Sequence, residues 1–256
     1  MAQLETLQLR LRSLHLPTAA QVSGEVVLQA QQANWSLETF ACELLDQELE
    51  GRRQRRIARL LKASHLPAGK TLATFELKRL PLRLQRLLPT LCEGDFVDHA
   101  ENLLLFGLPG RGKTHFAAAV GHELVQRGRE VLFSPTYQVV GQLLRAKRDL
   151  DLERALHRLD RFEVLILDDL GYVQQSREEM EVLFTLLAER YERRSVVITS
   201  NLVFSEWNQI FKDPLTTAAA IDRVVHHSQI IEFGKEVSSR RAEEAAQRQR
   251  ASRTAT

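Results

Sequence analysis

The spacing of hydrophobic positions changes along the chain. Up to about residue 65 the apolar residues, mostly leucines, recur at helical spacing with few turn signals between them. From about residue 100 onward, short uninterrupted apolar runs alternate with segments of helical spacing. An uninterrupted run is typical of a strand buried on both faces, and strands that alternate with helices pair in parallel. The pattern therefore predicts a small all-α domain followed by a three-layer α/β domain with a parallel sheet.

Each predicted element is placed by its apolar spacing. Short apolar runs predict strands at residues 103–106, 130–134, 164–167, 195–201 and 229–233. Segments of helical spacing predict helices at residues 4–16, 25–34, 36–63, 116–125, 136–147, 152–159, 178–191 and near Thr216. Helix-disfavouring residues interrupt the part between the two patterns, namely Pro67, Gly69, Pro81 and Pro89. There we predict an extended linker at residues 71–77, then a short amphipathic helix.

These elements divide the chain into four parts. We predict a helical N-terminal domain at residues 1–65, a linker with a short helix at 66–98, and the α/β domain at 99–235. Residues 236–256 form a charged tail that is low in apolar content, so we expect it to be frayed beyond about residue 243.

Composition narrows the class of protein. The 256 residues are 44% hydrophobic, and the net charge of +2 does not by itself indicate a nucleic-acid partner. Cys42 and Cys92 are not spaced as C-x-x-C, so these two cysteines are expected to make neither a zinc site nor a disulfide framework. The chain contains no apolar run near the roughly 18 residues that span a bilayer, and its N-terminus lacks a signal-peptide core. We therefore expect a cytoplasmic protein without membrane association.

The strongest chemical signal is G-x-x-x-x-G-K-T, placed between a predicted strand and a predicted helix. Glycines let the backbone bend tightly and turn its N–H groups toward a polyphosphate at the start of the helix. Lys113 is expected to reach the β- and γ-phosphates, and Thr114 to bind Mg²⁺. A glycine-rich turn with an incidental lysine would not account for the flanking elements. We predict that a nucleoside triphosphate binds Gly107, Pro109, Gly110, Arg111, Gly112, Lys113, Thr114 and His115.

Two acids, Asp168 and Asp169, follow the apolar run at residues 164–167. The carboxyl end of this strand lies at the same sheet edge as the glycine loop, which places both carboxylates beside the phosphates. A hard cation prefers oxygen ligands, so Asp168 suits Mg²⁺. Asp169 is placed to orient or deprotonate the attacking water. The pair therefore predicts triphosphate hydrolysis.

Other residues near this edge have two interpretations. Asn201, at the end of the next strand, can reach the γ-phosphate or the attacking water, or can cap the following turn. Phe75, Phe96 and Val97 can line an adenine pocket, although ordinary packing also explains them.

The predicted helix at residues 36–63 changes from acidic to basic along its length. Opposite charges at the two ends agree with the helix dipole, so the basic half is either a solvated face or a surface that contacts nucleic-acid phosphates. The candidate contacts are Arg52, Arg53, Arg55, Arg56 and Arg59, with Lys62 beside them.

Five stretches, in this order and spacing, resemble the IstB-like ATP-binding proteins: GLPGRGKTH, LILDDLGYV, ERYERRSVVITSN, FSEW and IDRVVHHS. These are ATPase helpers of bacterial insertion-sequence transposases, related to DnaC-type helicase loaders within the AAA+ class. The resemblance covers essentially the whole chain and implies an AAA+ domain with ATP and Mg²⁺.

The resemblance also implies roles for single residues. Lys113 and Thr114 match the Walker A pair and Asp168 the Walker B metal ligand, while Asp169 stands where Glu is commoner. Asn201 matches the sensor on the fourth strand. Arg223 would be an arginine finger for the ATP of a neighbouring subunit, and Arg240 the second-sensor arginine. Only 33 residues follow Arg223, so the lid is expected to be reduced or absent.

The function implied is ATP-dependent assembly on duplex DNA, as a homo-oligomeric ring or helix, followed by recruitment of the cognate transposase. Further DNA contacts are expected from Arg145, Lys147 and Arg148, through phosphates rather than base edges. Two alternatives remain. A replicative helicase loader would share the fold and the ATP chemistry, and a small-molecule kinase would use the same glycine loop.

Overall fold

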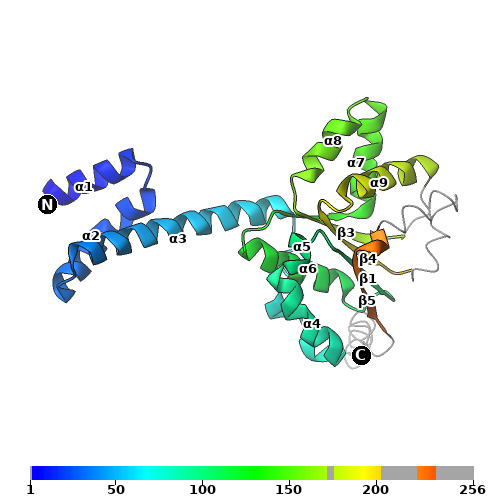
Figure 1. Ribbon diagram of the computed structural model, residues 1–256, viewed down its shortest axis with the longest axis horizontal. Helices are drawn as coiled ribbons and strands as arrows, with labels where there is room; N and C mark the ends of the chain where they lie inside the picture. Colours follow the sequence, from blue (N-terminus) through cyan, green and yellow to red (C-terminus); the bar gives the residue numbers. More distant parts are fainter. Residues whose placement is uncertain (1, 172–175, 203–223, 235–256) are drawn as a thin grey trace, which may run out of the picture. The chain divides into compact units, whose positions relative to one another are not determined.

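The computed structural model describes residues 2–171, 176–202 and 224–234 (Figure 1). The predicted helix near Thr216 and the C-terminal tail lie outside these residues. The chain forms two compact units, one up to Arg59 and one from Leu60 onward. Each unit is described separately below.

The first unit is helical. Its helices are α1 (Ala2–Ser13), α2 (Pro17–Ala33) and the first part of α3 (Leu37–Ser64). Leu11, Ala19 and Leu44 contribute to its small core. α2 begins eight residues earlier than predicted, because proline fits the first turn of a helix, where its missing N–H is not needed.

A buried carboxylate on α3 joins this helix to the first turn of α2. Glu48 on α3 accepts hydrogen bonds from the backbone N–H groups of Thr18 and Ala19, at 2.8 and 3.0 Å, in the first turn of α2. Burial alone would raise the pKa of Glu48, but hydrogen bonds from Ala19, Arg52 and Thr18 together hold that pKa below its ordinary value. An acidic side chain therefore caps the positive end of α2.

The second unit is built on a five-stranded parallel sheet with the order β2-β3-β4-β1-β5. The strands are β1 (Asn102–Gly107), β2 (Val131–Pro135), β3 (Val164–Leu170), β4 (Ser195–Ser200) and β5 (Ser228–Phe233). Every residue of β4 is buried, as expected for a strand covered on both faces. Strand ends agree with the predictions within two residues, except that β3 continues past the two acids.

Helices cover both faces of this sheet, with α4, α5 and α6 on one side and α7, α8 and α9 on the other (Figure 1). Their bounds are α4 (Leu82–Glu93), α5 (Asp95–Asp98), α6 (Lys113–Gln126), α7 (Thr136–Arg148), α8 (Leu152–Asp160) and α9 (Arg177–Arg190). This is the three-layer α/β architecture that the sequence predicted. Among the described residues, no helix is long and apolar enough to cross a membrane.

The segment before β1 departs from the prediction in two ways. Residues 71–77, predicted to be extended, contain the 3-10 turn η1 (Leu72–Thr74), and η2 (Leu77–Arg79) begins at their end. Pro89, predicted to interrupt a helix, lies inside α4. α4 tolerates the proline because Leu84, Leu88 and Leu91 are buried along one face, so packing outweighs the lost backbone hydrogen bond.

A buried arginine holds together the amino-terminal ends of β3 and β4. The guanidinium of Arg190 on α9 donates hydrogen bonds of 3.0–3.2 Å to the carbonyl oxygens of Leu159, Phe162, Glu163 and Ser195. Arg190 is only 1% exposed, and burial lowers its pKa to about 10, which leaves it charged at neutral pH. One cation thus satisfies four carbonyls at the edge opposite the glycine loop.

Replacing Arg190 by Met should lower the free energy of unfolding by about 3 kcal/mol, because buried carbonyls lose their donor. Chemical denaturation of the variant measures this loss. The matched control is Arg193→Met, since the Arg193 side chain is 58% exposed and pairs with Asp160 at the surface. In that control the free energy of unfolding should fall by less than about 1 kcal/mol. Equal losses in the two variants would contradict the structural role of Arg190.

Candidate functional site

The glycine loop lies at the carboxyl end of β1 and leads directly into α6. Gly107 has φ +145°, and a Cβ added there would lie 2.6 Å from the carbonyl oxygen of Phe233 on β5. Gly112, at φ +94°, is the N-cap of α6. Both positions need glycine, the first for close backbone approach and the second for its left-handed backbone. The loop therefore directs the amino end of α6 toward a bound anion.

Lys113 lies at the centre of the site and is 6% exposed. Its Nζ donates hydrogen bonds to the carbonyl oxygens of Gly107 (2.6 Å) and Leu108 (3.1 Å) and to Oδ1 of Asn201 (2.8 Å). Asn201 in turn donates from Nδ2 to Oδ1 of Asp169, at 2.7 Å. The loop lysine, the residue after β4 and the second acid of β3 thus form one connected network.

The acid pair lies at an irregularity in β3. The register between β3 and β4 shifts between Leu167 and Leu170, and Asp169 has a left-handed backbone with φ +62°. Asp168 is half-buried, whereas Asp169 is exposed to the cleft. The bulge lets the strand pair with β4 again at Leu170, beyond the two acids.

A buried hydroxyl connects the two acids. Oγ1 of Thr199 on β4 donates to Oδ1 of Asp168 at 2.6 Å and accepts from the backbone N–H of Asp169 at 2.8 Å. The Thr136 hydroxyl donates to the backbone carbonyl of Asp168 at 2.9 Å. These bonds fix the orientation of the Asp168 carboxylate before any ligand binds.

Most of the predicted residues line one cleft of about 530 Å³, which is large enough for a nucleotide. The predicted residues in its wall are Pro109, Gly110, Gly112, Lys113, Thr114, His115, Asp168, Asp169 and Asn201. Gly107 and Arg111 belong to the same loop but are not part of the wall. Arg223 and Arg240 lie outside the described residues.

Sequence reasoning missed the other residues in the wall, Gly69, Lys70, Thr74 and Thr199. Gly69, Lys70 and Thr74 belong to the segment before α4, which His115 holds against α6. Nε2 of His115 lies 3.1 Å from both the carbonyl oxygen of Thr71 and the hydroxyl of Thr74. In the sequence, Pro67 and Gly69 indicate only an interruption of helix, and no local pattern marks Lys70 or Thr74.

The aromatic candidates have packing partners. The ring of Phe75 makes edge contacts with His115 and Phe116, with centroids 4.8 and 6.1 Å apart. Phe96 is 3% exposed and belongs to the core.

The donors around the acid pair fit a magnesium ion. The side chains of Asp168, Thr114 and Asp169 supply only oxygen at this position, and the half-buried Asp168 carboxylate is already oriented by Thr199. Hard cations select such a set over one with nitrogen or sulfur. Mg²⁺ would thus be held by Asp168 and Thr114, beside the phosphates of the nucleotide.

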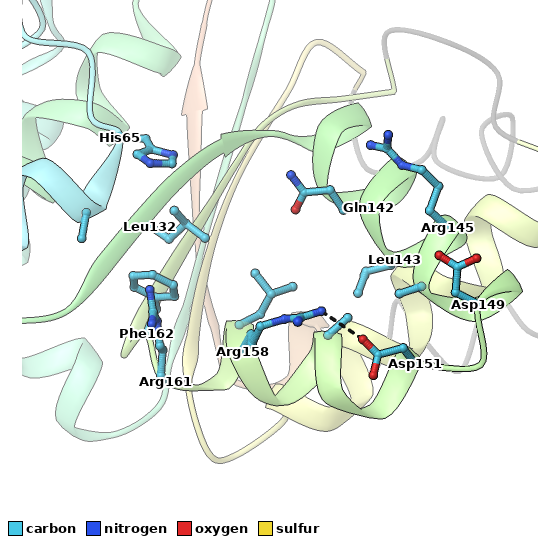
Figure 2. Close-up of a pocket in the computed structure, with 14 residues that line it drawn as sticks. His65, Leu132, Gln142, Leu143, Arg145, Asp149, Asp151, Arg158, Arg161 and Phe162 are labelled. Carbon is cyan, nitrogen blue, oxygen red and sulfur yellow. Dashed lines mark hydrogen bonds and ion pairs between the residues drawn. The ribbon is translucent and has the colours of Figure 1, made fainter.

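A larger cavity of about 620 Å³ lies elsewhere, between α7, α8 and β2 (Figure 2). Arg145, Arg158 and Arg161 line it together with Asp149 and Asp151, and Figure 2 shows the ion pair between Arg158 and Asp151. The described residues of its wall contain no glycine loop, so we assign the nucleotide to the smaller cleft.

Many of the predicted DNA contacts already have acidic partners. On α7, Lys147 pairs with Glu181 at 2.8 Å and Arg148 with Glu178 at 4.0 Å. On α3, the paired arginines are Arg52 and Arg55 with Glu48, and Arg53 with Glu50. The side chains of Arg56 and Arg59 on the same helix are exposed.

A glycine loop on a parallel sheet, with an acid pair and an Asn at the ends of neighbouring strands, defines a P-loop nucleotide-binding fold. A model of the IstB-like ATP binding proteins matches residues 9–247. The chain therefore belongs to this family, as its motifs predicted.

Two similar proteins from bacterial insertion sequences support this assignment. The chain is 43% identical, over 95% of its length, to an insertion-sequence ATP-binding protein of Sinorhizobium fredii, of which it covers 82%. It is 39% identical, over 89% of its length, to the ATP-binding protein of insertion sequence IS21 from Pseudomonas aeruginosa, of which it covers 85%.

Solved structures share the fold at low identity. The match to DnaI has a TM-score of 0.56 and 21% identity, and covers 66% of this chain and 95% of that one. The match to the DnaC helicase loader has a TM-score of 0.50 and 18% identity, and covers 69% of this chain and 99% of that one.

Replacing Thr199 by Val should weaken the apparent affinity for Mg²⁺ in the presence of an ATP analogue by roughly 10-fold or more, because the Asp168 carboxylate loses its orienting donor. Titration of Mg²⁺ against a fluorescent analogue measures this. Thr199→Ser keeps the hydroxyl and should behave like the wild type. An unchanged Mg²⁺ affinity in Thr199→Val would contradict the positioning role.

Proposed function

We propose that this protein is an ATP-hydrolysing helper that assembles on duplex DNA and recruits and stimulates its transposase. The observation that carries the proposal is the bonded network of Lys113, Asn201 and Asp169 in the nucleotide cleft. The chain's membership of an insertion-sequence ATP-binding family supplies the biological setting.

The chemistry follows from what each residue can do. Lys113 neutralises charge on the β- and γ-phosphates once it exchanges its present acceptors for phosphate oxygens. Asp169, which is exposed to the cleft, accepts a proton from or orients the attacking water, and Asn201 positions that water or the γ-phosphate. Magnesium supplies charge neutralisation when bound. A bound triphosphate therefore competes with the hydrogen bonds that Lys113 donates to Gly107, Leu108 and Asn201.

The proposed DNA contacts are the exposed basic side chains. Exposed ion pairs contribute at most about 1 kcal/mol, so a phosphate can replace Glu50, Glu178 or Glu181 at little cost. The side chain of Glu48 is only 2% exposed and caps α2, so Arg52 and Arg55 are less available. Contact should therefore rest mainly on Arg53, Arg56 and Arg59 of α3, and on Arg145, Lys147 and Arg148 of α7.

We further propose a homo-oligomer, either a ring or a helix, in which Arg223 of one subunit approaches the ATP of the next. A planar guanidinium suits the charge that develops on the transferring phosphoryl group. Arg240 would contact the subunit's own nucleotide. The assembly would work in the cytoplasm, where DNA and the transposase are available.

A helicase loader of DnaC type is the second candidate, favoured by the shared fold with DnaC and DnaI. Such a loader would bind a replicative helicase and single-stranded DNA. Capture of a purified helicase by this protein, with no response to duplex DNA, would favour the loader.

Replacing Asp169 by Asn should leave ATP binding intact and slow hydrolysis by roughly 100-fold, because the amide cannot accept the proton. Asn also tolerates the left-handed backbone at this position, so the fold should be preserved. Single-turnover assays measure the hydrolysis rate, and binding of a non-hydrolysable ATP analogue measures nucleotide affinity separately. Lys113→Ala is the contrasting variant and should lose binding itself. Wild-type hydrolysis in Asp169→Asn would refute the assignment.

ATP hydrolysis should rise with duplex DNA concentration while particle size grows in an ATP-dependent manner. Arg223→Ala should lose both responses and keep the nucleotide affinity of the single subunit. Hydrolysis assays combined with light scattering measure this, and raising the salt should weaken DNA binding steeply. Hydrolysis that is indifferent to DNA and confined to monomers would overturn the proposed function.

A further inference from the structure

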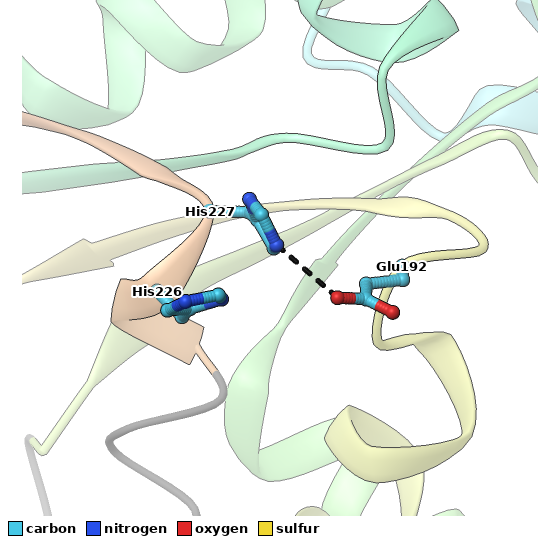
Figure 3. Close-up of side chains that lie close together, drawn as sticks. All are labelled: Glu192, His226 and His227. Atoms are coloured by element: carbon cyan, nitrogen blue, oxygen red, sulfur yellow. Dashed lines mark hydrogen bonds and ion pairs between the residues drawn. The ribbon is translucent and has the colours of Figure 1, made fainter.

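Two adjacent histidines and a glutamate lie together at the edge of the sheet opposite the nucleotide cleft. Glu192 follows α9 and precedes β4, while His226 and His227 directly precede β5. In a parallel sheet these positions belong to the amino-terminal ends of the strands. Figure 3 shows the three side chains converging from the two segments. This histidine-glutamate cluster takes no part in the nucleotide chemistry described above.

The geometry brings one ligand atom from each side chain close together. The three potential ligand atoms lie within 4.8 Å of one another. Nε2 of His227 lies 3.2 Å from Oε1 of Glu192, and the two imidazole rings meet edge to face with centroids 4.2 Å apart. Ligands about 2.1 Å from one ion in tetrahedral geometry lie about 3.4 Å apart, so small side-chain rotations would suffice.

A neighbouring hydroxyl orients one of the ligands. The Tyr191 hydroxyl lies 3.2 Å from Nδ1 of His226. A hydrogen bond on one ring nitrogen fixes which nitrogen remains for an ion, and such outer contacts typically hold metal-binding histidines. α9 ends at Arg190, and Glu192, with a left-handed backbone of φ +55°, lies in the turn that follows.

We propose that Glu192, His226 and His227 bind a divalent transition-metal ion of the Zn²⁺ type. Two imidazoles and one carboxylate are ligands that Zn²⁺, Co²⁺ and Ni²⁺ accept readily. Mg²⁺ prefers oxygen alone, so this site and the nucleotide site select different ions. The side chains of His227 and Glu192 are 42% and 57% exposed, which gives an ion direct access from solvent.

A bound ion would connect two segments that are far apart in the sequence. The turn between α9 and β4 would be joined to the residues that enter β5, which among the described strands pairs with β1 alone. Three protein ligands leave a coordination position open for water or for a group from another molecule. The inference is independent of the proposed function, because it needs neither ATP nor DNA.

The test is Zn²⁺ titration by calorimetry of the full-length, metal-stripped protein without nucleotide. Wild type should bind one equivalent of Zn²⁺ more than the double variant His226→Gln/His227→Gln. The matched control is His99→Gln/His157→Gln, which removes two exposed histidines elsewhere and should keep that equivalent. Mg²⁺ in place of Zn²⁺ should not occupy the site.

Two further variants make the test independent of folding. Glu192→Gln keeps the size of the side chain and should abolish or strongly weaken the same binding event. Tyr191→Phe should weaken it by roughly 10-fold, because only an outer contact of His226 is lost. Circular dichroism without zinc should match wild type in each variant. Equal zinc binding by wild type and the double variant, or none by wild type, would overturn the proposal.

Discussion

The ammonium group of Lys113 is the contact on which the candidate site depends. It joins the end of β1 to Asn201 after β4 and, through that amide, to Asp169 on β3. A buried ammonium without partners would be costly, so the surrounding acceptors are part of the fold as much as of the site. The nucleotide cleft is consequently held in shape before a ligand arrives.

This arrangement couples nucleotide binding to the acid pair. Phosphate oxygens must compete with the three acceptors of Lys113, which are the carbonyl oxygens of Gly107 and Leu108 and Oδ1 of Asn201. Release of Asn201 would change the hydrogen bonding of Asp169. The Asp168 carboxylate is held independently, by the Thr199 hydroxyl within the sheet. One acid thus has a fixed orientation, which suits a metal ligand, while the other is hydrogen-bonded to the amide that also contacts Lys113.

The sequence predicted the parts of this site that follow from strand ends and glycine spacing. Strands buried on both faces give uninterrupted apolar runs, so their carboxyl ends and the residues there could be located. Thr199 could not be identified, because a threonine in a strand is ordinary and its role depends on register with β3. Lys70 and Thr74 were missed for a similar reason. Their place in the cleft depends on the contacts that His115 makes with Thr71 and Thr74, which no local pattern indicates.

The two edges of the sheet show why similar side chains behave differently. At the carboxyl edge, glycines and a helix amino end leave room for an anion, and Asn201 connects Lys113 to Asp169. At the amino edge, Arg190 satisfies four carbonyls and is almost fully buried, so it has no capacity for a ligand. Glu192, His226 and His227 lie at that same edge but remain open to solvent, because the turn after α9 carries Glu192 outward. At the amino edge, solvent exposure therefore decides which polar group can bind an ion from solution. The exposed Glu192, His226 and His227 can, whereas the buried Arg190 cannot.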